Sequence, residues 1–190
     1  PNNGLMKRYD SYKDSGVEWL GEIPKEWNTS KMKFELTIFG RIGFRGYTTE
    51  DVVDEGEGVI SLSPSNITDD FNLKLSNSTF ISYEKYEESP EIKVFENDIV
   101  LVKTSSIGKV TIVKGESLPK MTLNPQLIVL KKVKPNNRFL YYYLISSYFQ
   151  YELQNEKSGG VMSTISQQKI KDFNLIIPPL SEQQQIVSFL

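Results

Sequence analysis

Short runs of hydrophobic residues dominate the middle of the chain and predict β-strands. These runs are rich in β-branched residues and are bounded by turn-forming residues such as glycine, proline, asparagine and serine. The predicted strands comprise residues 59–62, 79–83, 92–95, 98–102, 110–113 and 126–133. Residues 31–39 fit neither the helical nor the strand period, so they predict a short helix or strand before the glycine-rich segment 40–46.

Helical patterns occur mainly in the last third of the chain. Residues 139–153 carry aromatic and aliphatic side chains on most faces of a helix, which is typical of a buried helix. The shorter elements predicted are a helix at 17–20, a turn at Ile23–Pro24, a helix at 166–173 and a strand at 175–177 that ends before Pro178 and Pro179.

The last ten residues predict the start of a longer helix, because Ser181-Glu-Gln-Gln184 has the spacing of a capping box. The whole pattern predicts an α/β (α+β) fold with a twisted, mostly antiparallel sheet flanked by helices. We expect residues 1–5 to be a remnant that precedes a native start at Met6. Residues 6–180 are then one domain, and residues 181–190 begin a helix that continues past Leu190.

Cysteine and histidine are both absent from the 190 residues. Disulfides and thiolate metal sites are therefore excluded, and so are the commonest general base and the commonest transition-metal ligand. The longest uncharged apolar segment, residues 139–151, has 13 residues, fewer than the roughly 18 that a membrane span needs. The start of the chain is polar and charged, unlike a signal peptide. These features predict a soluble, cytoplasmic protein with no membrane segment.

The net charge of −2 hides an uneven distribution. Residues 50–98 contain 13 acidic and 3 basic residues, a balance of −10, whereas residues 103–138 contain 8 basic and 1 acidic residue, a balance of +7. A chain divided in this way can present one basic face to phosphates, although solvated charges on alternating strands would give the same counts.

Motifs that would indicate catalysis are incomplete. Gly40, Gly43 and Gly46 are spaced three apart and do not form a dinucleotide-binding pattern, and residues 115–122 lack the second glycine of a phosphate loop. Residues 124–127 begin like the Asn-Pro-Pro-aromatic tetrapeptide of amino-methyltransferases, but leucine replaces the aromatic residue that would stack on a flipped base. A small methyltransferase or nuclease is thus disfavoured. A protein-interaction module that docks through the aromatic helix stays open.

Several segments resemble type I restriction-modification specificity subunits. Residues 9–27 (YDSYKDSGVEWLGEIPKEW) resemble the amino-terminal signature of that family, and residues 97–109 (NDIVLVKTSSIGK) are similar to its "G-D-I-L-x-x-R-x-G-x-I-G-K" segment. Residues 124–126 (NPQ) stand where members carry an Asn and Gln pair. Residues 162–172 and 175–184 resemble the segment that ends a recognition domain and opens its spacer helix. Asn97 and the Ser105-Ser106 pair depart from the usual residues.

The resemblance implies a non-catalytic subunit with two DNA-recognition domains, each reading half of a split site, held apart by two long antiparallel helices. Methyltransferase subunits would pack around these helices, and a restriction and translocase subunit would join that core. S-adenosylmethionine, ATP and Mg²⁺ are expected only on those partners. This chain would then supply one recognition domain, residues 6–180, and the first turns of one spacer helix.

Three loops combine glycine with hydroxyl or basic groups, which suits contact with DNA: residues 40–46, 103–109 and 158–164. We expect them to share one DNA-facing surface, with the acidic stretch 50–98 mostly facing away; otherwise they are ordinary turns at opposite ends of the sheet. The candidates for base contacts are Arg41, Arg45, Lys103, Ser105, Ser106, Asn124, Gln126 and Thr164. The candidates for phosphate contacts are Lys109, Lys120, Lys169 and Ser163.

Overall fold

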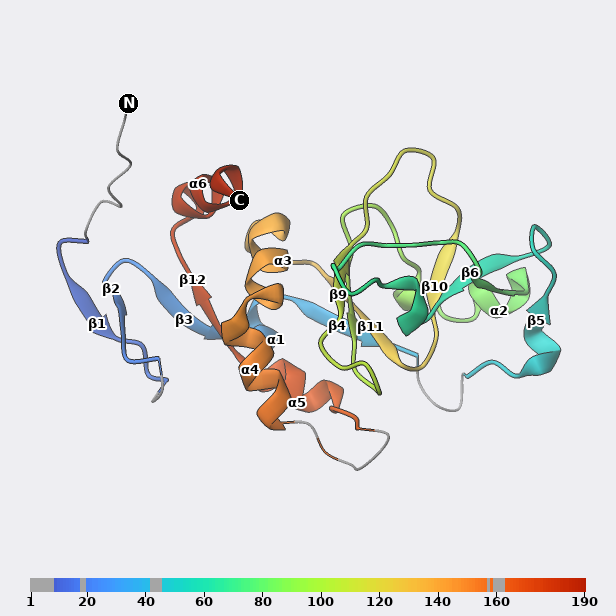
Figure 1. Cartoon of the computed structure of the whole chain (residues 1–190), viewed down its shortest axis with the longest axis horizontal. Coiled ribbons are helices and arrows are strands. Elements are labelled where there is room, and N and C mark those ends of the chain that lie inside the picture. The colour runs from blue at the N-terminus through green and yellow to red at the C-terminus, as the bar shows by residue number, and fades with distance from the viewer. Residues whose placement is uncertain (1–8, 18–19, 42–45, 157, 159–162) are drawn as a thin grey trace.

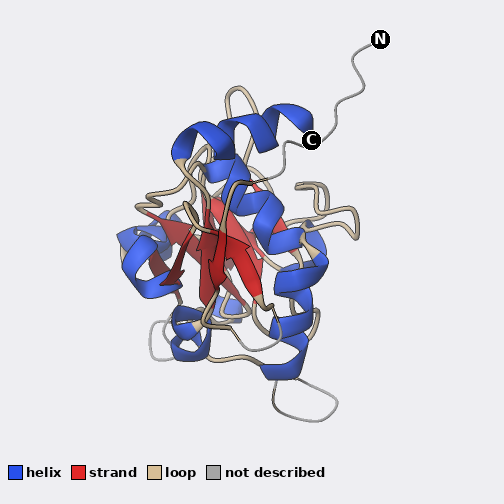
Figure 2. Ribbon diagram, turned by 90° about the vertical axis from the view of Figure 1, so that its left-hand side faces the viewer, coloured by secondary structure: helices blue, strands red, loops and turns tan. Residues whose placement is uncertain are grey.

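The computed structural model describes residues 9–17, 20–41, 46–156, 158 and 163–190 (Figure 1). Its centre is an antiparallel sheet in the order β4-β11-β8-β9. These strands are β4 (Thr37–Gly40), β11 (Leu127–Lys131), β8 (Ile99–Val102) and β9 (Val110–Ile112). Figure 2 shows the strands in the interior of the molecule with helices around them.

A second four-stranded sheet lies on one face of the central sheet, in the order β10-β6-β7-β5, and its β10–β6 pair is parallel. Its strands are β5 (Val52–Val53), β6 (Val59–Leu62), β7 (Thr79–Ile81) and β10 (Met121–Leu123). Two smaller sheets are also formed by the described residues: β1 (Tyr12–Asp14) with β2 (Glu22–Pro24), and β3 (Asn28–Lys31) with β12 (Asn174–Ile177).

The helices gather mainly on the other face of the central sheet, as Figure 1 shows for α3, α4 and α5. The helices are α1 (Met32–Glu35), α2 (Tyr83–Glu87), α3 (Asn137–Ile145), α4 (Ser147–Glu156), α5 (Gln167–Asp172) and α6 (Leu180–Phe189). In the described part of the chain, short 3₁₀ turns lie at Thr49–Asp51, Pro64–Asn66 and Pro90–Ile92. No helix of the described part of the chain is long and apolar enough to cross a membrane.

The central sheet is covered on both faces, and this explains why its strands are apolar at every position. In β8, Ile99 and Leu101 point into the cluster that includes Leu140 and Phe149 of the helices. The alternate residues of β8, Val100 and Val102, belong to the cluster shared with the second sheet. A strand with two buried faces carries a continuous apolar run rather than an alternating one. The predicted mixed α/β fold with mostly antiparallel sheets is confirmed.

Two predicted strands are corrected by local capping and turn residues. The strand predicted at 79–83 ends at Ile81, because the Ser82 hydroxyl accepts a hydrogen bond from Lys85 N and starts α2. The strand predicted at 92–95 is reduced to a single bridge at Val94, since Pro90 opens a 3₁₀ turn immediately before it.

The predicted helix at 139–153 is two helices, α3 and α4, separated at Ser146. Ser146 has extended backbone angles, and its hydroxyl donates to Tyr143 O at 2.6 Å and accepts from Phe149 N at 3.4 Å. This one side chain therefore closes one helix and helps to open the next.

Three further predictions need adjustment. The predicted turn at Ile23–Pro24 lies in strand β2. The capping box predicted at Ser181 is wrong, because α6 begins at Leu180 after Pro179 and has no side-chain cap at that end. The remnant predicted at residues 1–5 and the middle of the helix predicted at 17–20 lie outside the described residues.

Candidate nucleic-acid interface

Three chain connections leave the same end of the central sheet. The register pairs Gly40, the last residue of β4, with Ile128 near the start of β11, and pairs Val102, the last residue of β8, with Leu127. The start of the connection after β4, the β8–β9 loop and the β10–β11 turn are therefore neighbours, whereas residues 42–45 of the predicted loop 40–46 lie outside the described residues. We call this end of the sheet, with residues 103–109, 124–126 and 163–164 around it, the polar edge.

Two of the predicted loops meet at the polar edge. Thr104 and Thr164 form an isolated β-bridge, and their hydroxyl oxygens lie 3.1 Å apart. Ser105 N donates to Ser163 O at 2.8 Å, and Ile165 N donates to Lys103 O at 2.9 Å. The loops at 103–109 and 158–164 thus form one ordered unit where the structure describes them; residues 159–162 lie outside the described part.

Lys103 is a partly buried cation at this edge. Its backbone N donates to Gln126 O at 2.9 Å, which ties the loop to the β10–β11 turn. Burial alone lowers the pKa of its ammonium group, and no acidic residue of the described chain forms a salt bridge with it. An anion that approached the edge would therefore interact with an ammonium group that is already partly desolvated.

Hydroxyl and amide groups accompany Lys103. Ser105 and Ser106 are exposed, and Ser105 has a φ of 66°, a left-handed conformation that turns the chain sharply. Asn124 is only 8% exposed, since its Oδ1 accepts from Gln126 N and its Nδ2 donates to Gln126 Oε1. Asn124 therefore shapes the turn, while the partly exposed Gln126 is better placed to reach a ligand.

The predicted base contact of Arg41 has no support from its position. Arg41 is 4% exposed; its Nε donates to Leu123 O at 2.8 Å and its Nη2 to Thr122 Oγ1 at 3.2 Å. The guanidinium carbon also lies 5.6 Å from the centre of the Tyr47 ring, and burial lowers the pKa of the group. Arg41 thus links β10 to the connection after β4, and Arg45 lies outside the described residues.

The lysines predicted to contact phosphates all have protein partners. Lys109 forms a 2.6 Å ion pair with Asp69, Lys169 pairs with Glu156, and Lys120 lies over the Tyr83 ring at the opposite end of β10 from the polar edge. Lys120 is therefore not part of this surface. Ser163 takes part through its backbone carbonyl, which accepts from Ser105 N.

One residue of the acidic stretch 50–98, which is expected mostly to face away from DNA, lies beside the polar edge: Asp69. Its side chain is 94% exposed, and its carboxylate lies beside Lys109, at the end of the loop that begins with Lys103. Sequence reasoning could not foresee this contact, because 40 positions separate the two residues and Asp69, unlike Lys109, lies in no recognisable motif.

Two glutamines that sequence reasoning missed hold the β8–β9 loop from α4. Gln150 Nε2 donates to Gly108 O at 2.9 Å and to Leu144 O at 2.7 Å, and Gln154 Nε2 donates to Ile107 O at 3.4 Å. Gly108 has a φ of 96°, and a Cβ atom there would overlap Gln150 Oε1, so only glycine fits. In the sequence, Gly108 was the one signal that another part of the chain approaches this loop closely.

The fold and the polar edge define a class of protein: a mixed α/β binding domain that holds polar loops rigid at one end of a buried sheet. The described residues contain no group of three or more His, Cys, Asp or Glu residues that could hold a metal ion. Hydroxyl, amide and ammonium groups are the inventory that contacts phosphates and base edges.

Comparison with known proteins identifies the family. The model of the type I restriction modification DNA specificity domain matches residues 25–190, so the chain belongs to this family. Its role is therefore in DNA specificity rather than in catalysis.

Individual relatives agree with this family. The chain is 25% identical over 180 residues to a protein of Methanocaldococcus jannaschii named as the type I restriction enzyme MjaX specificity subunit, covering 90% of this chain and 40% of that protein. In fold it matches the HsdS subunit from Thermoanaerobacter tengcongensis (TM-score 0.66, 18% identity, 94% and 39% of the two chains). It also matches the type I S subunit from M. genitalium (TM-score 0.58, 15% identity, 86% and 37%). The chain thus spans about two fifths of each relative.

Proposed function

We propose that the polar edge binds duplex DNA and reads a short base sequence there. The groups that would approach the bases are Lys103, Ser105, Ser106, Gln126 and Thr164. One observation carries the proposal: two loops distant in sequence form a single hydrogen-bonded unit beside a partly buried ammonium group that no described carboxylate neutralises. A rigid frame matters because base readout depends on hydrogen bonds of fixed geometry.

At the level of the whole protein, the chain reads one half of a bipartite site and directs methyltransferase subunits, and through them a restriction and translocase subunit, to that site. S-adenosylmethionine, ATP and Mg²⁺ belong to those partners. Two observations support the proposal that the chain is one domain of a larger subunit: it belongs to the specificity family, and it covers about two fifths of the length of its relatives. Because its target is DNA in a prokaryotic cell, the protein acts in the cytoplasm.

The rival function, a docking module that uses the aromatic helix, loses its main support. Phe139 and Leu140 of α3 and Phe149 of α4 are at most 6% exposed and belong to the core, so most of the apolar face is already used. The other rival, a small DNA-modifying enzyme, is tested by incubating the pure chain with labelled S-adenosylmethionine and DNA.

Lys103→Ala tests the proposal, with Lys114→Ala as the matched control. Lys114 is exposed and belongs to the same basic stretch, but it follows β9 at the end of the sheet away from the polar edge. Fluorescence anisotropy with a labelled duplex across a salt series should give weaker binding for Lys103→Ala. If Lys103 contacts a phosphate, the logarithmic salt slope should also fall by about one. Equal effects of the two substitutions would contradict a DNA site at the polar edge.

A further inference from the structure

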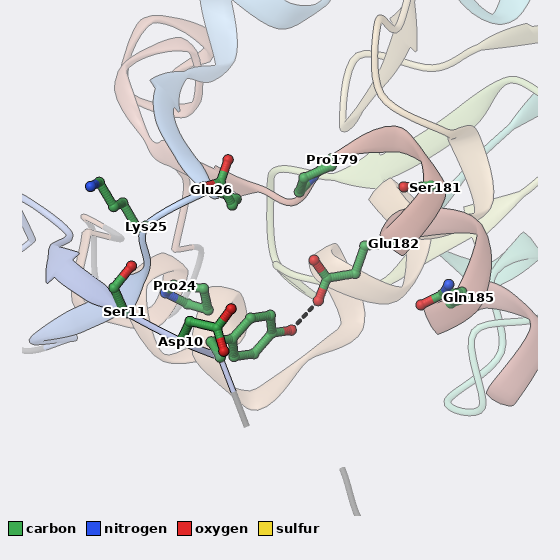
Figure 3. Close-up of a pocket in the computed structure, with 10 residues that line it drawn as sticks. Asp10, Ser11, Pro24, Lys25, Glu26, Pro179, Ser181, Glu182 and Gln185 are labelled. Carbon is green, nitrogen blue, oxygen red and sulfur yellow. Dashed lines mark hydrogen bonds between the residues drawn. The ribbon is translucent and has the colours of Figure 1, made fainter. Parts of the chain in front are cut away.

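The first turn of α6 is attached to a distant part of the chain through Glu182. Its Oε1 accepts a hydrogen bond from the Tyr9 hydroxyl, and its Oε2 accepts one from Trp27 Nε1 at 2.9 Å. Tyr9 and Glu182 line the same groove, and the dashed line at Glu182 in Figure 3 marks this hydrogen bond. The Tyr9 and Trp27 rings contact each other edge to face at 6.0 Å, so the two donors form one unit.

The neighbouring residue, Gln183, attaches the same turn in a second direction. It is 3% exposed; its Nε2 donates to Pro178 O and its Oε1 accepts from Asn136 N, both at 2.8 Å. Asn136 in turn caps α3 by accepting from Arg138 N and Phe139 N. Adjacent residues therefore tie α6 to the amino-terminal segment on one side and to α3 on the other.

Among the described residues, no side chain beyond the first turn of α6 forms a hydrogen bond with another element. Ile186 and Val187 are half-buried, and Ile186 lines an apolar groove with Tyr142 of α3. Phe189 and Leu190 are 86% and 65% exposed. The later turns therefore rest on apolar contacts, and the directional contacts of the helix are those of its first turn. Apolar contacts allow a helix to tilt or slide, whereas hydrogen bonds to a carboxylate are directional and comparatively strong. A tilt at the first turn also displaces every later residue in proportion to its distance along the helix, at about 1.5 Å per residue.

We propose that Glu182 is a positioning residue that fixes the direction in which α6 leaves the domain, and thereby the angle between this helix and the polar edge. A further consequence rests on the proposed function. Where α6 leads to a second recognition domain, this angle sets how the two half-sites must be placed along the DNA.

The chain contains no cysteine, so two introduced cysteines can carry spin labels without background. Ser188→Cys on α6 and Asn155→Cys on α4 are both exposed positions. Pulsed electron paramagnetic resonance on this labelled chain should give a narrow distribution of distances, and Glu182→Ala should at least double its width. Trp27→Phe keeps an aromatic ring but removes the indole N–H, and it should give an intermediate width.

Gln185→Ala is the matched control, because Gln185 lies one turn from Glu182 in the same helix and lines the same groove. It should leave the distribution unchanged. Widths that stay the same in Glu182→Ala and Trp27→Phe would overturn the positioning role, whatever the outcome of the DNA-binding tests.

The consequence for DNA requires the full-length subunit assembled with its methyltransferase subunits. The methylation rate of a target is divided by that of a target whose half-sites are one base pair further apart. Glu182→Ala should reduce this ratio at least fivefold. Unchanged discrimination would overturn this consequence. Binding of DNA that carries a single half-site distinguishes the two failures. If this binding is weakened by Lys103→Ala but not by Glu182→Ala, the proposed function holds and only the consequence for half-site spacing fails.

Discussion

Removing the negative charge of Asp69 should strengthen DNA binding. Asp69 Oδ1 lies 2.6 Å from Lys109 Nζ, so the carboxylate occupies the position that a phosphate would take if DNA approached the end of the β8–β9 loop. The Asp69→Asn substitution keeps the size of the side chain and removes its charge. Lys109 also donates to Ile67 O at 3.3 Å, which would hold the ammonium group near its present place.

The expected magnitude follows from the geometry. A phosphate at Lys109 would lie roughly 5 Å from the Asp69 carboxylate, and two unit charges at that distance in water repel by about 0.8 kcal/mol. Salt reduces this repulsion, so the gain should be about 0.4–0.8 kcal/mol, or roughly two- to fourfold in affinity. The cost to folding should be no more than about 1 kcal/mol, because the Asp69 side chain is 94% exposed and exposed ion pairs contribute little.

Fluorescence anisotropy with a labelled duplex over a series of salt concentrations measures this gain. Asp54→Asn is the matched control, because Asp54 is an exposed residue of the same acidic stretch and lies in the turn after β5. The salt slope should also steepen by about one in Asp69→Asn, since Lys109 becomes free to displace a counterion. In the double variant with Lys109→Ala the gain should disappear. If Asp69→Asn binds no better than Asp54→Asn, Lys109 does not face the DNA.

Two substitutions test how the polar edge is built, and an assay of the unmodified chain tests its assignment to DNA specificity. Arg41→Ala should cost about 2–4 kcal/mol of unfolding free energy, because it leaves the buried Leu123 O and Thr122 without their donor; denaturant unfolding measures this. Gln150→Ala should cost about 1–3 kcal/mol and weaken DNA binding, since the loop loses its tie to α4. The pure chain should transfer no methyl group from labelled S-adenosylmethionine to DNA; turnover above background would contradict its assignment to specificity.

The strands of the core were predictable because their sequences are constrained by burial. The run at 59–62 coincides with β6, and the run at 98–102 differs from β8 by one residue. All four residues of each strand are buried. Local polar contacts were less predictable: at Ser146, one hydroxyl divides a helix that the apolar pattern would have continued.

The polar edge was only partly predictable, for a physical reason. The loops at 103–109 and 158–164 share a composition of glycine, hydroxyl and lysine, which pointed to one surface. The roles of individual side chains depend on partners far away in the chain. Arg41 bonds to Leu123 across 82 positions, and Gln150 bonds to Gly108 across 42. Residue type alone could not distinguish a buried arginine that joins two strands from one that faces a ligand.

The attachment of α6 should depend on pH through Tyr9. Burial, and then the hydrogen bond to Glu182 and its negative charge, raise the pKa of the Tyr9 hydroxyl from its ordinary 10.0 to about 12. A raised pKa means that the protonated phenol is favoured in the folded state. Its contribution is therefore fully present below pH 10 and is lost as the pH rises through 12.

Glu182→Ala should lower the pKa of Tyr9 only partway towards 10.0, because burial, the largest cause of the shift, persists in part without the carboxylate. Ultraviolet difference titration measures this pKa when each protein is compared with its Tyr9→Phe counterpart, which cancels the signals of the other tyrosines. The spin-label distances described for α6 should broaden over the same pH range in the wild-type chain and stay constant in Tyr9→Phe. A Tyr9 pKa that is identical with and without Glu182 would mean that burial alone causes the shift, and the Tyr9–Glu182 hydrogen bond would then contribute nothing to the direction of the helix.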